Sequence, residues 1–249
     1  MSNRSALAAA PLALAFLAST PARAVVGGAE DAGPLARASV MVLSAHGGVC
    51  TAVVVARDAV LTAGHCAAGG EHRVHWRGDD GAPVLVAPAA KAVHPGYDAN
   101  AIAARRRSID LALIRLPEPL PARFATATLS TAAPPAGSSL TFGGYGVARA
   151  GDGRSSGTFR AATLAAIEPH GPSRILVWAR GAAGAGACQG DSGGPIAQSG
   201  SAAVFAVATW AAGDKGQGCG GISQGVLLGP QRDWIDRTLK AWGRSAAWE

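Results

Sequence analysis

The chain has 249 residues, of which 49% are hydrophobic, and a formal net charge of +6. This length is ample for a hydrophobic core and fits one compact unit with two lobes. After residue 24 no stretch approaches the roughly 18 uninterrupted apolar residues of a membrane span, so we expect no membrane anchor. No nucleic-acid motif surrounds the one basic cluster, Arg105-Arg106-Arg107, so we expect no nucleic-acid partner.

Residues 1–24 have the pattern of a secretory signal peptide. Arg4 provides a positive start, a short apolar run follows, and Ala22-Arg23-Ala24 is a small-residue cleavage site. Cleavage there would make Val25 the N-terminus and predicts a secreted protein, either extracellular or periplasmic. Two alternatives stay open: a pro-peptide cut after Arg23 followed by trimming, and a disordered alanine-rich tail.

Short β-prone runs separated by Gly and Pro fill the remaining chain, and long amphipathic helical patterns are scarce. This pattern predicts an all-β, barrel-like architecture. The Pro-rich stretch 117–121 is typical of a linker and divides the chain into a first barrel over 25–120 and a second over 121–230. The spacing of apolar residues from Trp234 predicts an amphipathic helix within the C-terminal segment 231–249.

Two candidate catalytic residues lie in the first predicted barrel. His65 follows an apolar, β-prone run and therefore stands at the end of a buried strand. Asp110 precedes the apolar run 111–114, so its carboxylate needs a partner such as a histidine N–H. Each is also explained without catalysis, His65 as a capped core histidine and Asp110 as an acid bonded to its own backbone.

The stretch 188–195, Cys-Gln-Gly-Asp-Ser-Gly-Gly-Pro, contains the third candidate, Ser192. Its glycines allow a tight turn that brings backbone N–H groups beside the serine oxygen. A serine becomes an effective nucleophile when a base accepts its proton and such donors stabilise the oxyanion. A glycine-rich surface turn with an incidental serine is the alternative.

Chain order separates the known catalytic triads. The glycines around Ser192 also fit the α/β-hydrolase pattern, but that order needs a later histidine, and none of the six follows Ser192. The subtilisin order would use Asp31 or Asp58, but the chain lacks the alternating helices and strands of that fold. The order His65, Asp110, Ser192 is that of chymotrypsin.

The chain thus resembles a secreted, bacterial-type member of the trypsin/chymotrypsin-like serine protease family. The resemblance implies two six-stranded antiparallel β-barrels with a C-terminal α-helix, and a serine endopeptidase that needs no metal or cofactor. It implies a monomer that acts on protein or peptide substrates and is open to protein inhibitors. The matching motifs follow one another in the family's order: Val25-Val26-Gly27-Gly28, Thr62-Ala63-Gly64-His65-Cys66, Asp110-Leu111-Ala112-Leu113, Gly190-Asp191-Ser192-Gly193-Gly194-Pro195 and Thr209-Trp210.

The resemblance also assigns roles. The N–H groups of Gly190 and Ser192 would form the oxyanion hole, and the freed amino group of Val25 would pair with Asp191. A specificity pocket without an acidic floor would favour small to medium apolar side chains over Arg or Lys. Its expected residues are Gly186 at the floor, Ala187 beside it, and Thr209, Trp210, Ala211 and Gly225.

The even number of cysteines behind a signal peptide indicates disulfides, and a zinc site is disfavoured because no C-x₂-C pair occurs. The resemblance implies the pairs Cys50–Cys66 and Cys188–Cys219.

Three departures from the family's pattern stand out: Thr51-Ala52 where many relatives have two glycines, Gly64 in place of Ala, and Thr209 in place of Ser, whose hydroxyl is still expected to bond Asp110. Two other functions remain open: an inactive homologue that acts as a binding protein, and an esterase with the same triad.

Overall fold

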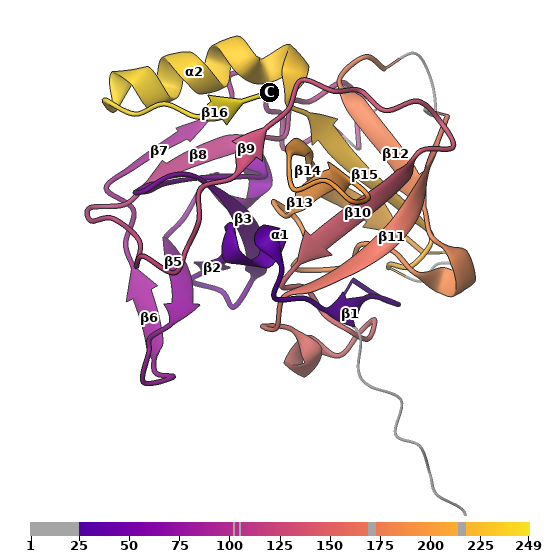
Figure 1. Ribbon diagram of the computed structural model, residues 1–249, viewed down its shortest axis with the longest axis horizontal. Helices are drawn as coiled ribbons and strands as arrows, with labels where there is room; N and C mark the ends of the chain where they lie inside the picture. Colours follow the sequence, from indigo (N-terminus) through magenta and orange to yellow (C-terminus); the bar gives the residue numbers. More distant parts are fainter. Residues whose placement is uncertain (1–24, 102, 105, 169–172, 214–217) are drawn as a thin grey trace, which may run out of the picture.

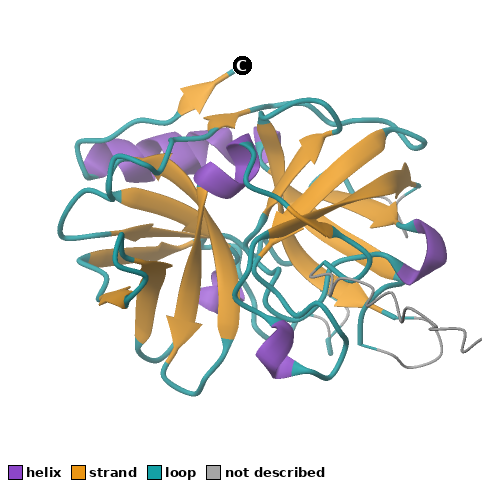
Figure 2. Cartoon of the chain, turned by 60° about the horizontal axis from the view of Figure 1, so that its bottom comes forward, coloured by secondary structure: helices purple, strands orange, loops and turns teal. Residues whose placement is uncertain are grey.

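The fold is known from a computed structural model that describes residues 25–101, 103–104, 106–168, 173–213 and 218–249. The predicted signal peptide, 1–24, lies outside the described residues. Two sheets of mainly antiparallel strands stand side by side, the first on the left and the second on the right in Figure 1. Figure 2 shows the same two halves from another side, with loops gathered along the seam between them.

The first sheet has the strand order β6-β5-β2-β3-β4-β8-β7, and every pairing in it is antiparallel. No pairing between β6 and β7 closes it within the described residues, so it is a curled half-barrel of seven strands where a six-stranded barrel was expected. The strands are β2 (Ser39–Ser44), β3 (Val49–Ala56), β4 (Ala59–Thr62), β5 (His72–Arg77), β6 (Pro83–Val86), β7 (Ala90–Val93) and β8 (Ala112–Arg115).

The second sheet closes on itself, because β13 pairs with both β10 and β14 and completes a six-stranded barrel. The closed strands are β10 (Ser139–Gly144), β11 (Arg160–Ile167), β12 (Leu176–Arg180), β13 (Pro195–Gln198), β14 (Val204–Ala212) and β15 (Ile222–Leu227). Short strands extend it, namely β1 (Ala29–Glu30), β9 (Thr128–Leu129) and β16 (Ala247–Trp248).

Helical segments are short. The α-helices are α1 (Pro34–Arg37) and α2 (Arg232–Ala241), and the 3-10 turns are η1 (Gly64–Cys66), η2 (Gly153–Ser155), η3 (Ala182–Gly184) and η5 (Gly229–Gln231). The buried Ile235 and Leu239 of α2 face the protein, as expected for the amphipathic C-terminal helix.

The two halves share a hydrophobic core. Leu61 and Leu113 of the first sheet belong to the same buried cluster as Val207 and Val226 of the second, together with Leu239 of α2. Burial of this kind is the main favourable contribution to folding and fixes packed elements relative to one another. The loops at the seam therefore rest on a common core.

The N-terminal segment crosses the predicted domain boundary. Residues 25–120 were expected to form the first barrel, but Val25 lies in the core of the second, and β1 pairs with β11. The tail crosses in the opposite direction, since the Arg244 guanidinium donates to both carboxylate oxygens of Asp58 at 2.6 and 2.8 Å. Each half is thus tied down by an end of the chain.

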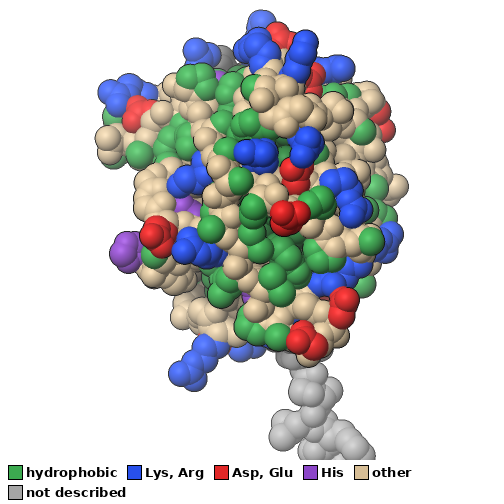
Figure 3. All heavy atoms as spheres, turned by 90° about the vertical axis from the view of Figure 1, so that its left-hand side faces the viewer, with side chains coloured by type: hydrophobic (Ala, Val, Ile, Leu, Met, Phe, Trp, Pro, Cys, Tyr) green, Lys and Arg blue, Asp and Glu red, His purple; other side chains and the backbone are tan. Residues whose placement is uncertain are grey.

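No helix among the described residues is long and apolar enough to cross a membrane. On the face of the molecule formed by the first sheet, Lys and Arg side chains are interspersed with acidic and apolar ones (Figure 3). Mixed charge of this kind gives no single-sign field over that face.

Candidate active site

The carboxylate of Asp110 holds His65 at two points. His65 lies in η1, which follows β4, and Asp110 lies just before β8, the neighbour of β4 in the sheet. The ring Nδ1 of His65 is 2.8 Å from Oδ2 of Asp110, and the backbone N–H of His65 donates to Oδ1 at 2.8 Å. The carboxylate fixes both the imidazole ring and the turn that carries it.

Steric contacts explain why a glycine, Gly64, precedes His65. A Cβ at Gly64 would lie 2.9 Å from Oδ1 of Asp110 and 2.9 Å from the ring of Tyr97. Contacts under about 3.0 Å are not tolerated without movement, so this glycine lets the carboxylate and the tyrosine ring approach the turn. Burial and the nearby charge of Asp110 raise the pKa of Tyr97 above its usual value.

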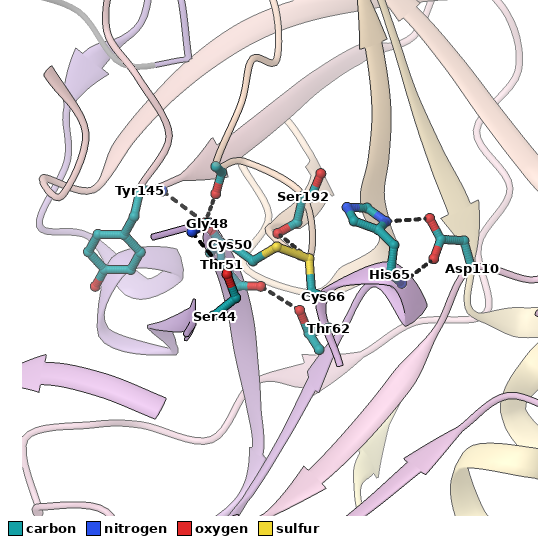
Figure 4. The surroundings of a disulfide bond; sticks show 11 residues. Ser44, Gly48, Cys50, Thr51, Thr62, His65, Cys66, Asp110, Tyr145 and Ser192 are labelled. Atoms are coloured by element: carbon teal, nitrogen blue, oxygen red, sulfur yellow. Dashed lines mark hydrogen bonds and ion pairs between the residues drawn. A yellow bond between two sulfur atoms is a disulfide. The ribbon is translucent and has the colours of Figure 1, made fainter. Parts of the chain in front are cut away.

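Ser192 lies beside the imidazole, on the side opposite Asp110 (Figure 4). Ser192, His65 and Gly190 line one cavity of about 530 Å³. Within the described residues no hydrogen bond joins the serine hydroxyl to the ring. The three candidate residues thus come together at the seam, although two of them belong to the first half and one to the second.

Backbone contacts fix the loop before Ser192. The N–H of Val147 donates to the carbonyl of Gln189 at 2.9 Å, and the N–H of Asp191 donates to the carbonyl of Cys188 at 3.1 Å. Gly190 has a φ of +97°, a conformation that L side chains rarely adopt.

Asp191 is a buried carboxylate with no cationic partner within hydrogen-bonding distance among the described residues. Its two oxygens accept the N–H groups of Gly146 and Cys188, both at 2.9 Å. Burial raises the pKa of Asp191 to about 7, although both hydrogen bonds act in the opposite direction. Gly144 and Gly146 leave room for this side chain, since a Cβ at either would collide with Oδ1.

Val25, the expected partner of Asp191, is fully buried in the second core. Its neighbour Val26 pairs with Gly186, whose N–H donates to the Val26 carbonyl at 2.9 Å. The chain continues before Val25, so its nitrogen is an amide and cannot carry the charge that the expected ion pair needs. Val25 also has a φ of 40°, which a β-branched residue adopts only under strain.

Three of the residues expected around the specificity pocket, Gly186, Ala187 and Ala211, lie close together. Ala211 pairs with Ser223 across β14 and β15, and Ser223 Oγ accepts the N–H of Ala187 at 2.9 Å. A Cβ on Gly186 would lie 3.1 Å from the same oxygen. Gly186, Ala187, Ala211 and Ser223 therefore form one cluster.

Gly225 lies outside this cluster. It pairs with Ala208, and a Cβ on it would collide with Ile196 in the barrel interior. Ser223, which was not among the expected residues, is the residue that pairs with Ala211. The resemblance indicated Gly225, two positions further along β15, and its place in the pocket stays a prediction.

The expected hydrogen bond from Thr209 to Asp110 is absent. Oγ1 of Thr209 is buried and has no partner in the described part of the chain. Strand β14 carries a register shift between Ala208 and Trp210, and such a bulge changes the direction of the residue within it. Thr209 and Trp210 instead line a second cavity, of about 790 Å³, which also reaches His65 and Asp110.

The structure contains two disulfides, Cys50–Cys66 and Cys188–Cys219, the pairs that the resemblance implies. The first joins β3 to the His65 turn, and the second begins four residues before Ser192. Cys50 and Cys66 lie near His65, but their sulfurs are bonded to each other and offer no thiolate to a metal.

Comparisons with known proteins identify similar chains. The mouse and human proteins named serine protease 56 are both 29% identical to the chain, over 225 and 223 residues. The match covers 78% of this chain but only 35% of either relative, so the chain spans about a third of their length. These mammalian relatives give no support to the bacterial part of the resemblance.

The solved structure of neuropsin, a serine protease of mouse brain, has the same fold. It superimposes with a TM-score of 0.71 at 21% identity, covering 86% of this chain and 99% of neuropsin. The family called Trypsin matches residues 25–235. The chain therefore belongs to the trypsin family of serine proteases.

Proposed function

We propose that the protein is a secreted serine endopeptidase that hydrolyses peptide bonds through an acyl-enzyme on Ser192. The observation that supports this most is the double contact of Asp110 with His65, on a cavity wall shared with Ser192. A carboxylate bonded to Nδ1 leaves Nε2 as the proton acceptor, which is the tautomer that general-base catalysis requires.

In this mechanism His65 accepts the proton of Ser192 as the hydroxyl attacks the scissile carbonyl. Asp110 holds the ring and stabilises its positive form, and His65 then returns the proton to the leaving amine. In the second half of the reaction water attacks the acyl-enzyme, with His65 again accepting and returning the proton, and the acid product leaves Ser192. Catalytic hydrogen bonds are often long without substrate, so the missing bond between Ser192 and His65 is compatible with these roles.

The negative charge on the carbonyl oxygen would be stabilised by the N–H groups of Gly190 and Ser192. Loss of one such donor typically lowers turnover on the order of 10²–10³-fold. Both residues border the same cavity as His65, which supports this assignment.

Activation is proposed to follow cleavage before Val25. In the unprocessed chain the buried Asp191 lacks a cation, and an unpaired buried charge is costly. A free amino group at Val25 would supply that cation. N-terminal sequencing of the active secreted protein tests this step, and a start at any other residue contradicts it.

The proposed side-chain preference before the cleaved bond is small to medium and apolar. The cluster of Gly186, Ala187, Ala211 and Ser223 contains no acidic residue that would select Arg or Lys. Ala211 and Ser223 are paired on neighbouring strands, so their side chains are close, and Ser223 is fully buried beside the backbone of Ala187. A peptide-library profile dominated by Arg or Lys would overturn this preference.

The function is tested with the protein that begins at Val25. A fluorophosphonate should label wild type and not Ser192→Ala, and only wild type should cleave an unstructured protein substrate. Labelling of wild type without peptide cleavage would identify an esterase. A correctly processed wild type that neither labels nor cleaves would identify an inactive homologue.

A further inference from the structure

Thr51 connects the first sheet to the loop that carries the nucleophile. It lies in β3 and is fully buried. Its N–H donates to the carbonyl of Ser192 at 2.8 Å, and its hydroxyl donates to the carbonyl of Gly190 at 2.8 Å. The same hydroxyl accepts the N–H of Tyr145 at 2.9 Å. These contacts link residues 139 and 94 positions apart in the chain.

The two carbonyls that Thr51 holds belong to the two proposed oxyanion donors. Gly190 is the less constrained of them, because it has no side chain and adopts a φ of +97°. The peptide that joins Gln189 to Gly190 is held by the hydrogen bond from the Val147 N–H to the Gln189 carbonyl. The Thr51 hydroxyl holds the peptide that follows Gly190, so the backbone of Gly190 is fixed on both sides.

Thr51 is itself held in place. Oγ1 of Thr62 donates to the Thr51 carbonyl at 2.7 Å, and both residues are fully buried. A Cβ at Gly193 would collide with the Thr51 carbonyl and with the Thr62 hydroxyl, so the turn after Ser192 packs directly against this pair. The Thr51 side chain and backbone therefore have little freedom to move.

We propose that the hydroxyl of Thr51 is a positioning group for the oxyanion hole, which keeps the Gly190 N–H directed at the substrate carbonyl. The proposal rests on the proposed peptidase function. A glycine at this position, common in the family, would keep a backbone N–H but has no hydroxyl for Gly190 or Tyr145. Removing the hydroxyl here deprives the buried Gly190 carbonyl and the part-buried Tyr145 N–H of a partner, which favours rotation of the peptide between Gly190 and Asp191 and with it a change in the backbone of Gly190.

The test compares Thr51→Val with Thr51→Ser in the processed protein. Val keeps the shape of the side chain and loses the hydroxyl, while Ser keeps the hydroxyl. We expect Thr51→Val to lower kcat about tenfold and to change KM less than about threefold, because the oxyanion forms only in the transition state. Inhibition by a peptide aldehyde, whose adduct carries a comparable oxygen, should weaken by the same factor. Thr51→Ser should stay within about threefold of wild type.

Thr238→Val is the matched control, since its hydroxyl also donates at 2.8 Å to a backbone carbonyl, that of Trp234 in α2. It should lower the melting temperature with kcat unchanged. If Thr51→Val does not fold, Thr51→Gly takes its place, with the same expected loss of kcat. The proposal is overturned if kcat stays within about twofold of wild type, or if Ser and Val lower it equally. Wild type without hydrolysis would instead overturn the proposed function, and this is seen before any variant is compared.

Discussion

The two loops that meet at the candidate site are held in different ways. The His65 turn is fixed inside its own sheet, where Asp110 on a neighbouring strand bonds both its backbone and its ring. The Ser192 loop depends on contacts from elsewhere, since Thr51 reaches it from the other sheet and the buried Asp191 has no cation within hydrogen-bonding distance in the described part of the chain. The acid–base half of the site is thus already assembled in the described chain, whereas the nucleophile half depends on the other sheet and, in the proposed activation step, on a free amino group at Val25.

The largest expected effect comes from Asp110→Asn. If the His65 turn is held within its own sheet, Asn keeps one bond but favours the wrong ring tautomer, and kcat should fall by about 10⁴-fold. The fold should persist, because the hydrophobic cores of both halves are untouched. Steady-state kinetics at pH 8 and a melting curve measure the two quantities. A loss of kcat below about tenfold would show that the Asp110 contact is not catalytic.

Removing the two disulfides one at a time shows how much each of the two loops depends on its bridge. The bridges span 16 and 31 residues, so pairwise Cys→Ala replacement should cost about 3 and about 4 kcal/mol of unfolding free energy respectively. Residual activity should differ more than stability does. Without Cys50–Cys66, Asp110 still holds His65, whereas the loss of Cys188–Cys219 frees the loop before Ser192. Urea unfolding and kinetics on the two double variants measure both. Equal losses of activity would contradict the comparison.

The pH dependence of stability tests the role of Asp191. Its pKa of about 7 in the folded unprocessed chain exceeds the ordinary value of 3.8, so the folded state keeps a proton that the unfolded state has lost. Stability of the unprocessed chain should therefore fall as pH rises from about 4 to about 7, by a few kcal/mol in order of magnitude, and stay level above that.

Full-length Ser192→Ala, which cannot cleave itself, is compared with the same variant beginning at Val25. The decrease of stability between pH 4 and 7 should be present in the full-length variant. It should be absent in the variant that begins at Val25, where the amino group is expected to pair with the Asp191 carboxylate. Adding Asp191→Asn to the full-length chain should remove it. A fall of equal size in both chains would mean that Val25 and Asp191 do not pair.

The smallest expected effects distinguish Ser223 from Gly225. Ser223→Gly widens the space opposite Ala211 and should shift the preference toward larger side chains such as Phe, by about tenfold in relative kcat/KM or less. Gly225→Ala should instead lower stability, because its methyl group collides with Ile196. Peptide profiling and melting curves measure the two effects. A shift of preference in Gly225→Ala alone would restore Gly225 as the pocket residue.

Much of the fold was predictable from sequence because its signals are local. Alternating β-prone runs, glycine turns and the amphipathic segment after residue 231 depend on neighbouring residues and predict strands, turns and a helix directly. The half-barrel and the crossing of residues 25–30 to the second core were not predictable. They depend on which strand edges meet, a choice made by long-range packing.

At the candidate site the sequence by itself determined the chemistry: which residues could serve as base, acid and nucleophile, their order, and the family. It also marked Thr51 as a departure without indicating a role. Only the tertiary structure decided that the Thr51 hydroxyl reaches Gly190, that Ser223 stands opposite Ala211, and that Thr209 misses Asp110. The reason is physical: residue type fixes what a side chain can donate or accept, whereas strand register and packing fix which groups come within 3 Å of one another.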